Sequence, residues 1–191
     1  MSKWPINYFR FKSTWLVIRA AMLFSFLYVF SGHAAASTPN KELKKGESLP
    51  WIAGWTVDGQ VINLNHLLRK GYGVNVLVVS ASWCEACKVC FKKLMPMKAS
   101  FKKKKIGLFA VDYMEDADTA NKYLSKFGFS SETIIVDQFG TISASLGVLG
   151  RAKSGAEVAS LPLSVLFDSE TKVMDVVEGC PDFLLNKIVR P

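Results

Sequence analysis

The sequence has few cysteines and few histidines: among 191 residues there are four and two. Four cysteines are too few to hold a domain of this size together as a disulfide scaffold. Three of them, Cys84, Cys87 and Cys90, crowd one short segment, which indicates a chemical rather than a structural use. The chain shows no internal repeat, little low complexity and no sign of sequence-specific nucleic-acid binding. Half of it is hydrophobic, which fits one globular domain plus an extra segment.

The extra segment is the beginning of the chain. Residues 1–19 contain four basic residues and no acidic one, and an uncharged apolar stretch follows at 20–30. Small residues come next, with Ala34 and Ala36 spaced as an A-x-A cleavage site. This order predicts a signal peptide over residues 1–36. The apolar stretch is short of the roughly 20 residues that a membrane span needs, although an uncleaved anchor that starts a few residues earlier stays open.

Export determines how the cysteines and the charge are interpreted. Outside the cytoplasm thiols tend to oxidise, so disulfide chemistry is expected. Of the formal charge of +8, four basic residues belong to the leader, which leaves 20 basic and 16 acidic residues. The run Lys102–Lys105 is interpreted as an exposed helix end, where the helix dipole favours cations. The alternative is contact with an anionic partner or a membrane surface.

The rest of the chain is predicted to be a polar linker at 37–48 and one domain at 49–191. The apolar, β-branched run 74–81 is typical of a central strand buried on both faces. A helix is expected from Cys84 to about residue 104, with a kink at Pro96. Further strands are expected at 106–113, 133–137, 161–168 and 173–177, a hairpin turn at 58–59, further helices at 119–127 and 181–189, and an exposed loop at 151–160.

The spacing of the cysteines allows two interpretations. In one, a strand runs into Cys84-x-x-Cys87 at a helix start, where unpaired N–H groups and the helix dipole lower the pKa of Cys84. Cys87, one turn inward, can then resolve a mixed disulfide on Cys84. In the other, Cys84, Cys87 and Cys90 bind zinc or an iron–sulfur cluster, with Cys180-Pro181 as a distant ligand. Helical spacing turns successive cysteines by about 60°, which makes them fan out and opposes the second interpretation.

Two stretches carry a resemblance to a known family: "VDGQVINLNHLLRKGYGVNVLVVSASWCEACK" and, downstream, "LPLSVLFDSETKVMDVVEG". Together they resemble the thioredoxin superfamily, in particular the TlpA/ResA/CcmG-like exported thiol–disulfide oxidoreductases. The likeness spans about residues 49–189. It implies an α/β thioredoxin-like fold with a mixed central sheet, flanking helices and an added N-terminal β-hairpin, for which "WTVDGQVINL" is the matching stretch.

The resemblance also assigns roles within the site. Cys84 matches the exposed attacking cysteine and Cys87 the resolving one. Pro162 matches the cis-proline that faces the disulfide and leaves the backbone of Leu161 free to pair with a substrate strand. The other matching positions are Trp83, which precedes the cysteines, and Glu85 and Ala86, which lie between them and tune the redox potential in this fold.

The sequence departs from the family at several positions. Ala86 stands where relatives commonly have proline. Cys90 stands where ResA-like members carry an acidic residue, and Val78 where thioredoxin has a buried acid. The domain is therefore expected to lack two candidate proton acceptors. The segment 150–160 is longer than in simple members, lies beside the site and could set partner choice.

Cys90 and Cys180 have no assigned role. Cys90 is interpreted first as a small buried apolar residue on the inner face of the helix. Two alternatives stay open: it traps Cys87 in a non-productive disulfide, or it pairs with Cys180, which requires the two Cα atoms within about 7 Å.

The expected activity is the reduction of disulfides in periplasmic or extracytoplasmic proteins, for example apocytochrome c. The resemblance implies a membrane electron donor of the DsbD or CcdA type. We expect no bound cofactor apart from the redox-active Cys84–Cys87 disulfide, and a monomer. The alternative is a thiol chaperone or metal-handling protein on the same fold. Copper-delivering Sco proteins use C-x-x-x-C and a downstream histidine, whereas here His33 and His66 both precede the cysteines.

Overall fold

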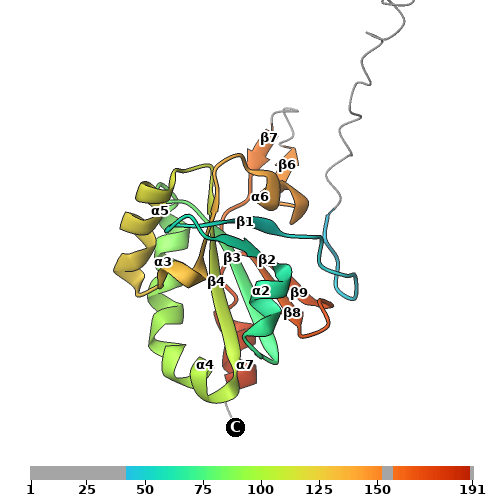
Figure 1. The fold of residues 1–191 in the computed structure, drawn as a ribbon. Helices are drawn as coiled ribbons and strands as arrows, with labels where there is room; N and C mark the ends of the chain where they lie inside the picture. Colours follow the sequence, from blue (N-terminus) through green and yellow to red (C-terminus); the bar gives the residue numbers. More distant parts are fainter. Residues whose placement is uncertain (1–41, 152–156, 190–191) are drawn as a thin grey trace, which may run out of the picture. The chain divides into compact units, whose positions relative to one another are not determined.

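A mixed sheet of seven strands, in the order β2-β1-β5-β4-β3-β8-β9, forms the centre of the domain (Figure 1). It is seen in a computed structural model that describes residues 42–151 and 157–189; the predicted signal peptide lies outside these residues. No helix within those ranges is long and apolar enough to cross a membrane. The strands are β1 (Ala53–Thr56), β2 (Val61–Asn63), β3 (Val74–Ser80), β4 (Ile106–Tyr113), β5 (Ile134–Asp137), β8 (Leu163–Asp168) and β9 (Val173–Glu178).

β3 is the central strand that the apolar run predicts. It pairs in parallel with β4 on one side and antiparallel with β8 on the other. Six of its seven residues are buried, because helices cover both faces of the sheet at this point. Side chains of alternating residues enter two separate cores, with Leu77 and Val79 in one and Val76 and Val78 in the other.

The predicted N-terminal hairpin extends the sheet at one edge. β1 and β2 pair antiparallel around the turn at Asp58 and Gly59, and Gly59 has a φ of +77°, which a glycine adopts without steric cost. β1 joins the main sheet by pairing with β5, with Trp55 opposite Val136. The added hairpin of the thioredoxin-like arrangement is thus confirmed.

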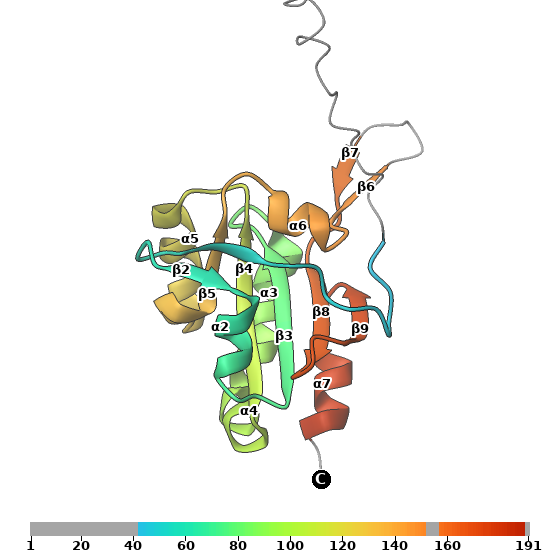
Figure 2. The same cartoon turned by 45° about the vertical axis from the view of Figure 1, so that its right-hand side comes forward.

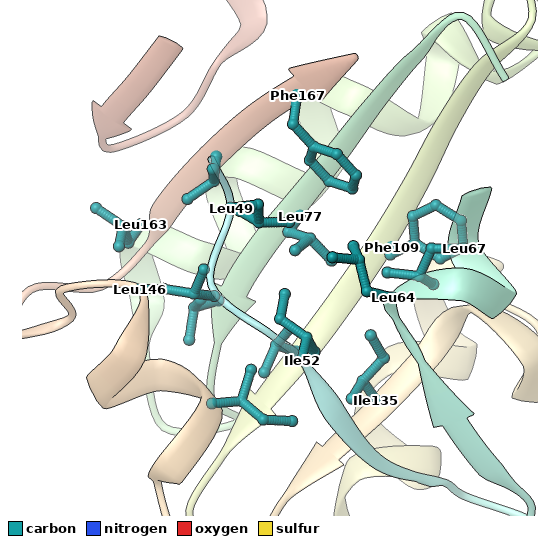
Figure 3. Close-up of a cluster of buried hydrophobic side chains, with 14 of the residues drawn as sticks. Leu49, Ile52, Leu64, Leu67, Leu77, Phe109, Ile135, Leu146, Leu163 and Phe167 are labelled. Carbon is teal, nitrogen blue, oxygen red and sulfur yellow. The ribbon is translucent and has the colours of Figure 1, made fainter. Parts of the chain in front are cut away.

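Helices divide between the two faces of the sheet (Figure 2). Side chains of α2 and α6 pack into one core with Leu77, Phe109 and Phe167 (Figure 3). Side chains of α3, α4, α5 and α7 pack into the other. The helices are α2 (Leu64–Arg69), α3 (Glu85–Leu94), α4 (Lys98–Lys104), α5 (Ala117–Leu124), α6 (Thr141–Ser145) and α7 (Asp182–Val189).

The long helix expected after Cys84 is interrupted where Pro96 predicts a kink. α3 and α4 are separated by a 3₁₀ turn, Met95–Met97, that contains this proline. Lys102, Lys103 and Lys104 form the last turn of α4, and Lys105 ends it in a left-handed conformation. The lysine run is therefore a helix end, as predicted.

One expectation about the chain beside the site was wrong. Within the segment 151–160, predicted as an exposed loop, Glu157–Ala159 form strand β7, which pairs antiparallel with β6 (Leu149–Arg151); residues 152–156 lie outside the described residues. Strands of three residues are too short to show an alternating pattern, and the polar, small composition hid them. The described part of the predicted linker, residues 42–48, contributes the buried side chain of Leu43 to the core.

Gly107 on β4 offers a test of how tightly the sheet is packed beside β3. A Cβ atom there would lie 2.5 Å from Tyr72 Cδ2 and 2.9 Å from Asn75 Oδ1. Gly107→Ala is expected to lower the free energy of unfolding by about 1–3 kcal/mol through overpacking. Gly73→Ala is the control, because a Cβ at Gly73 meets nothing within 4 Å. Equal urea midpoints for the two variants would contradict this packing.

Candidate active site

Cys84 and Cys87 form a disulfide at the start of α3, with their Cα atoms 5.3 Å apart. β3 ends at Ser80, a short turn follows, and Cys84 becomes the N-cap residue of α3. The backbone N–H of Cys87 donates to Cys84 Sγ over 3.1 Å. Because the same N–H would face a thiolate after reduction, the helix start can stabilise the charged form of Cys84.

The two cysteines are not equally accessible. The Cys84 residue is 7% exposed, whereas Cys87 is fully buried. Trp83, next to Cys84, is 60% exposed and presents a flat apolar surface at the rim of the site. This asymmetry suits one sulfur that a partner reaches and a second that acts only from within.

Leu161 lies against the cluster that contains the disulfide, although it is far away in the sequence, and Pro162 follows it. The peptide bond between them is cis, as predicted. Leu161 is partly buried and packs against the small cluster of Ala81, Cys84 and Cys87. The structure thus brings the predicted loop to the predicted cysteines.

Glu85 and Ala86, the two residues between the cysteines, are both exposed. The Glu85 carboxylate forms an ion pair with Lys88 of the same helix and points to solvent. It is therefore placed for contact with a partner and not beneath the disulfide.

A buried acid that the sequence analysis missed lies under the start of α3. Val78 and Cys90 leave two acidic positions of the family without an acid, as expected, but Asp112, on β4, is fully buried and was not foreseen. It pairs in register with Ser80 of β3. Alternation along the strands points both side chains to the face that α3 covers, together with Val78 and Ala110. A single charged residue within an apolar strand was the signal that could have revealed it.

The environment of Asp112 favours its neutral form. Burial, followed by the negative charge of Glu115, hydrogen bonding with the Glu115 side chain and the charge of Asp116, raises the pKa of Asp112 to about 8. Apart from Glu115, no group among the described residues offers a hydrogen bond to either carboxyl oxygen. A proton on Asp112, shared with the carboxylate of Glu115, is the arrangement that removes the repulsion between the two acids.

Glu115 links this acid to the loop that leads into the cysteines. Its carboxylate accepts from the backbone N–H of Ser82 over 2.7 Å and from the Ser82 hydroxyl. Tyr123 on α5 faces the same group: burial first, and then the charges of Asp112, Glu115 and Glu85, raise its pKa. The hydroxyls of Tyr123 and Ser80 are buried and lack a partner among the described residues.

Cys90 and Cys180 form a second disulfide, with their Cα atoms 5.2 Å apart. The first interpretation of Cys90, an unpaired apolar residue, was therefore wrong, and the pairing with Cys180 is the alternative that the structure shows. Cys90 is almost fully buried on α3, and Cys180 lies between β9 and α7.

The four cysteines do not converge on one point. They are divided between two disulfides, and the described residues contain no group of three or more His, Cys, Asp or Glu side chains arranged to hold a metal ion.

Comparison with known proteins supports the fold and the chemistry. No family model matches the sequence, and no curated protein matches it. Among solved structures, a protein assigned as the thiol:disulfide interchange protein DsbE of Chlorobium tepidum is 26% identical, with a TM-score of 0.61. That likeness covers 78% of this chain and 96% of the other.

Two further structures from Mycobacterium tuberculosis share the fold. The peroxidoxin BcpB is 20% identical with a TM-score of 0.63, covering 78% of this chain and 95% of its own. A secreted disulfide oxidoreductase homologous to Escherichia coli DsbE is 17% identical with a TM-score of 0.55, covering 72% and 93%. The chain has the fold of the thioredoxin superfamily and, with the likeness to the Chlorobium protein, is a thiol–disulfide oxidoreductase.

The raised pKa of Asp112 predicts a pH dependence of stability. The folded protein holds this proton up to about pH 8, whereas the unfolded chain releases it near 3.8. Between these values the folded state binds more protons, so the contribution of Asp112 falls as the pH rises, by at most about 1.4 kcal/mol per pH unit. Asp112→Asn should remove the contribution of this group to the slope of the free energy of unfolding against pH, measured by urea unfolding at pH 5–8.

Asp58→Asn is the matched control for this measurement. Asp58 is an exposed turn residue whose pKa is lowered, chiefly by its hydrogen bond from the Thr56 side chain, and its charge is not among those that raise the pKa of Asp112. Its contribution is lost only as the pH falls through that lowered pKa, so the slope of this variant over pH 5–8 should match that of the unmodified protein. Parallel slopes for all three proteins would rule out the assignment of a buried neutral acid.

Proposed function

We propose that this chain is an exported oxidoreductase that reduces disulfides in extracytoplasmic proteins. The observation that carries the proposal is the Cys84–Cys87 disulfide at the start of α3, packed against Leu161 beside a cis-proline. A disulfide at a helix start is poised for exchange, because the helix stabilises the thiolate that forms when it opens.

The reaction uses two electrons and two cysteines. In the reduced protein the thiolate of Cys84 attacks one sulfur of a partner disulfide, and the other partner sulfur leaves as a thiolate that takes a proton. The Cys87 thiol then loses its proton and attacks Cys84 Sγ. The mixed disulfide breaks, the Cys84–Cys87 disulfide forms, and the partner leaves with both sulfurs reduced.

Asp112 is the group that we assign to the proton of Cys87. It lies on the sheet face beneath α3, and with its pKa raised to about 8 it is mostly neutral near neutral pH. Asp112 therefore first passes its own proton towards Glu115 and solvent, and then takes the proton of Cys87 as a carboxylate. Glu115, hydrogen-bonded to Ser82 and only partly buried, leads from Asp112 towards solvent.

The reductase direction and the partners rest on the resemblance to TlpA-, ResA- and CcmG-like proteins. Electrons would come from a membrane protein of the DsbD or CcdA type, and apocytochrome c is a candidate substrate. Trp83, with the backbone of Leu161 and Pro162, would bind an extended segment of that partner. The basic, apolar and small-residue order of residues 1–36 supports export. The protein would act as a monomer without a bound cofactor.

Substitution of each cysteine separates the two chemical steps. Cys84→Ser should abolish reduction of insulin disulfides, because it removes the attacking sulfur. Cys87→Ser should still attack but stall as a mixed disulfide, which non-reducing gels and mass spectrometry would detect. Both variants keep the Cys90–Cys180 disulfide, so they are matched controls for each other. Insulin reduction by Cys84→Ser at the unmodified rate would refute the assignment.

Redox titration tests the direction. Equilibration with dithiol buffers, differential alkylation and peptide mapping would report the Cys84–Cys87 couple separately from Cys90–Cys180. The potential of Cys84–Cys87 should lie well below the value of about −120 mV of the oxidant DsbA. A potential at or above that value would contradict a reductase, and stoichiometric metal bound by the cysteines would support the metal-handling alternative instead.

A further inference from the structure

The second disulfide joins the helix that carries the active cysteines to a turn on the far side of the site. Cys90 lies on α3, directly after the solvent-exposed Val89, and is 1% exposed. Its partner Cys180 lies in the turn between β9 and α7. Because a covalent bond spans α3 and this turn, neither can shift along the other without moving both.

The same turn holds the loop that faces the active disulfide. Gly179, adjacent to Cys180, donates its backbone N–H to the carbonyl of Pro162 over 2.7 Å. The carbonyl of Gly179 accepts from Ser164 Oγ over 2.9 Å. Gly179 has a φ of +120°, which L side chains rarely adopt, so the backbone conformation of this turn depends on glycine.

These contacts close a ring around the site. From Cys84 the chain runs along α3 to Cys90, crosses the disulfide to Cys180, and passes through Gly179 to Pro162. Leu161 then packs against the cluster of Ala81, Cys84 and Cys87, which closes the ring. A second connection between α3 and α7, the ion pair of Lys93 with Asp182 at 3.3 Å, is partly exposed and contributes little.

We propose that the Cys90–Cys180 disulfide positions the Leu161–Pro162 loop against the Cys84–Cys87 disulfide, and thereby sets the rate of exchange with extended polypeptides. The inference rests on the proposed function of the same site. A polypeptide must place its sulfur at Cys84 while its backbone meets the loop, so it needs both parts in fixed relation. A small thiol needs Cys84 alone. Cys90 and Cys180 are thus positioning residues and take no part in the exchange.

The test opens the active disulfide with two thiols of different size. The protein is used with both disulfides formed, without prior full reduction, which would also open Cys90–Cys180; during the initial phase the burial of Cys90 protects that bond. A thiolate attacks Cys84 Sγ, the Cys84–Cys87 bond breaks, the thiol becomes linked to Cys84, and Cys87 leaves as a thiolate that takes a proton. The thiols are an unstructured 12-residue peptide with one cysteine and 2-mercaptoethanol. Acid quenching and mass spectrometry give the initial rates.

The double variant Cys90→Ala/Cys180→Ala removes the second disulfide without leaving a free thiol that could exchange with Cys87. Its rate with the peptide, relative to 2-mercaptoethanol, should fall about five- to tenfold, which corresponds to the loss of about one net hydrogen bond. The control, Leu185→Ala, truncates a fully buried side chain of α7 and leaves the Cys90–Cys180 disulfide intact. It should destabilise the domain but keep the ratio of the two rates.

Hydrogen exchange provides a readout that does not depend on activity. The Gly179 amide is expected to be protected in the unmodified protein and in Leu185→Ala, and to lose protection in the double variant. An unchanged rate ratio with a protected Gly179 would overturn the proposal, and so would equal slowing with both thiols. If neither thiol opens Cys84–Cys87 in the unmodified protein, the proposed function fails. Hydrogen exchange at the Gly179 amide still tests whether the Cys90–Cys180 disulfide holds the turn in place.

Ser164→Ala covers the case in which the double variant does not fold. It removes the hydrogen bond to the Gly179 carbonyl and keeps both disulfides. The peptide-to-mercaptoethanol ratio should fall about two- to threefold, with faster exchange at Gly179. A ratio and an exchange rate equal to those of the unmodified protein would overturn the proposal on this variant alone.

Discussion

The antiparallel pairing of β3 with β8 is the constraint on which the site depends. Its register runs from Val74 opposite Asp168 to Val79 opposite Leu163. The chain that leaves β3 and the chain that enters β8 therefore meet at the same end of the sheet, which brings Cys84 next to Leu161. A slip of one residue would turn buried side chains to the wrong face, so the two cores fix the register and, with it, the site.

The parallel pairing of β3 with β4 adds the acid at the same end. Its last pair places Asp112 beside Ser80, on the face that α3 covers. There the helix start favours a negative sulfur, while burial and Glu115 disfavour a negative Asp112. Below about pH 8 Asp112 consequently adds no negative charge beneath the start of the helix. The helix stabilises a thiolate most effectively while Asp112 stays neutral.

Features set by local sequence could be predicted, and those set by long-range register could not. The cysteine spacing, the helix start and the kink at Pro96 are local, and a resemblance supplied the cis-proline. Asp112 looked like the polar end of a strand, because only the pairing with Ser80 shows which face it joins. Cys90 and Cys180 are 90 residues apart, and only the packing of α7 beside α3 brings their Cα atoms to 5.2 Å. The pairing of β6 with β7 rests on short strands whose composition carries no periodic signal.

The loop at Leu161 is held from both sides, by the β6–β7 pair and by the turn that carries the second disulfide. On one side Ser160, directly after β7, donates its N–H to the carbonyl of Val148 over 2.9 Å. On the other side Gly179 holds the carbonyl of Pro162. Leu161 lies between these anchors, partly exposed, against the active disulfide. A loop fixed at both ends loses little freedom when a polypeptide pairs with it, so more of the contact energy is available for binding. The β6–β7 pair and the second disulfide thus both restrict the movement of the loop at Leu161, from opposite sides.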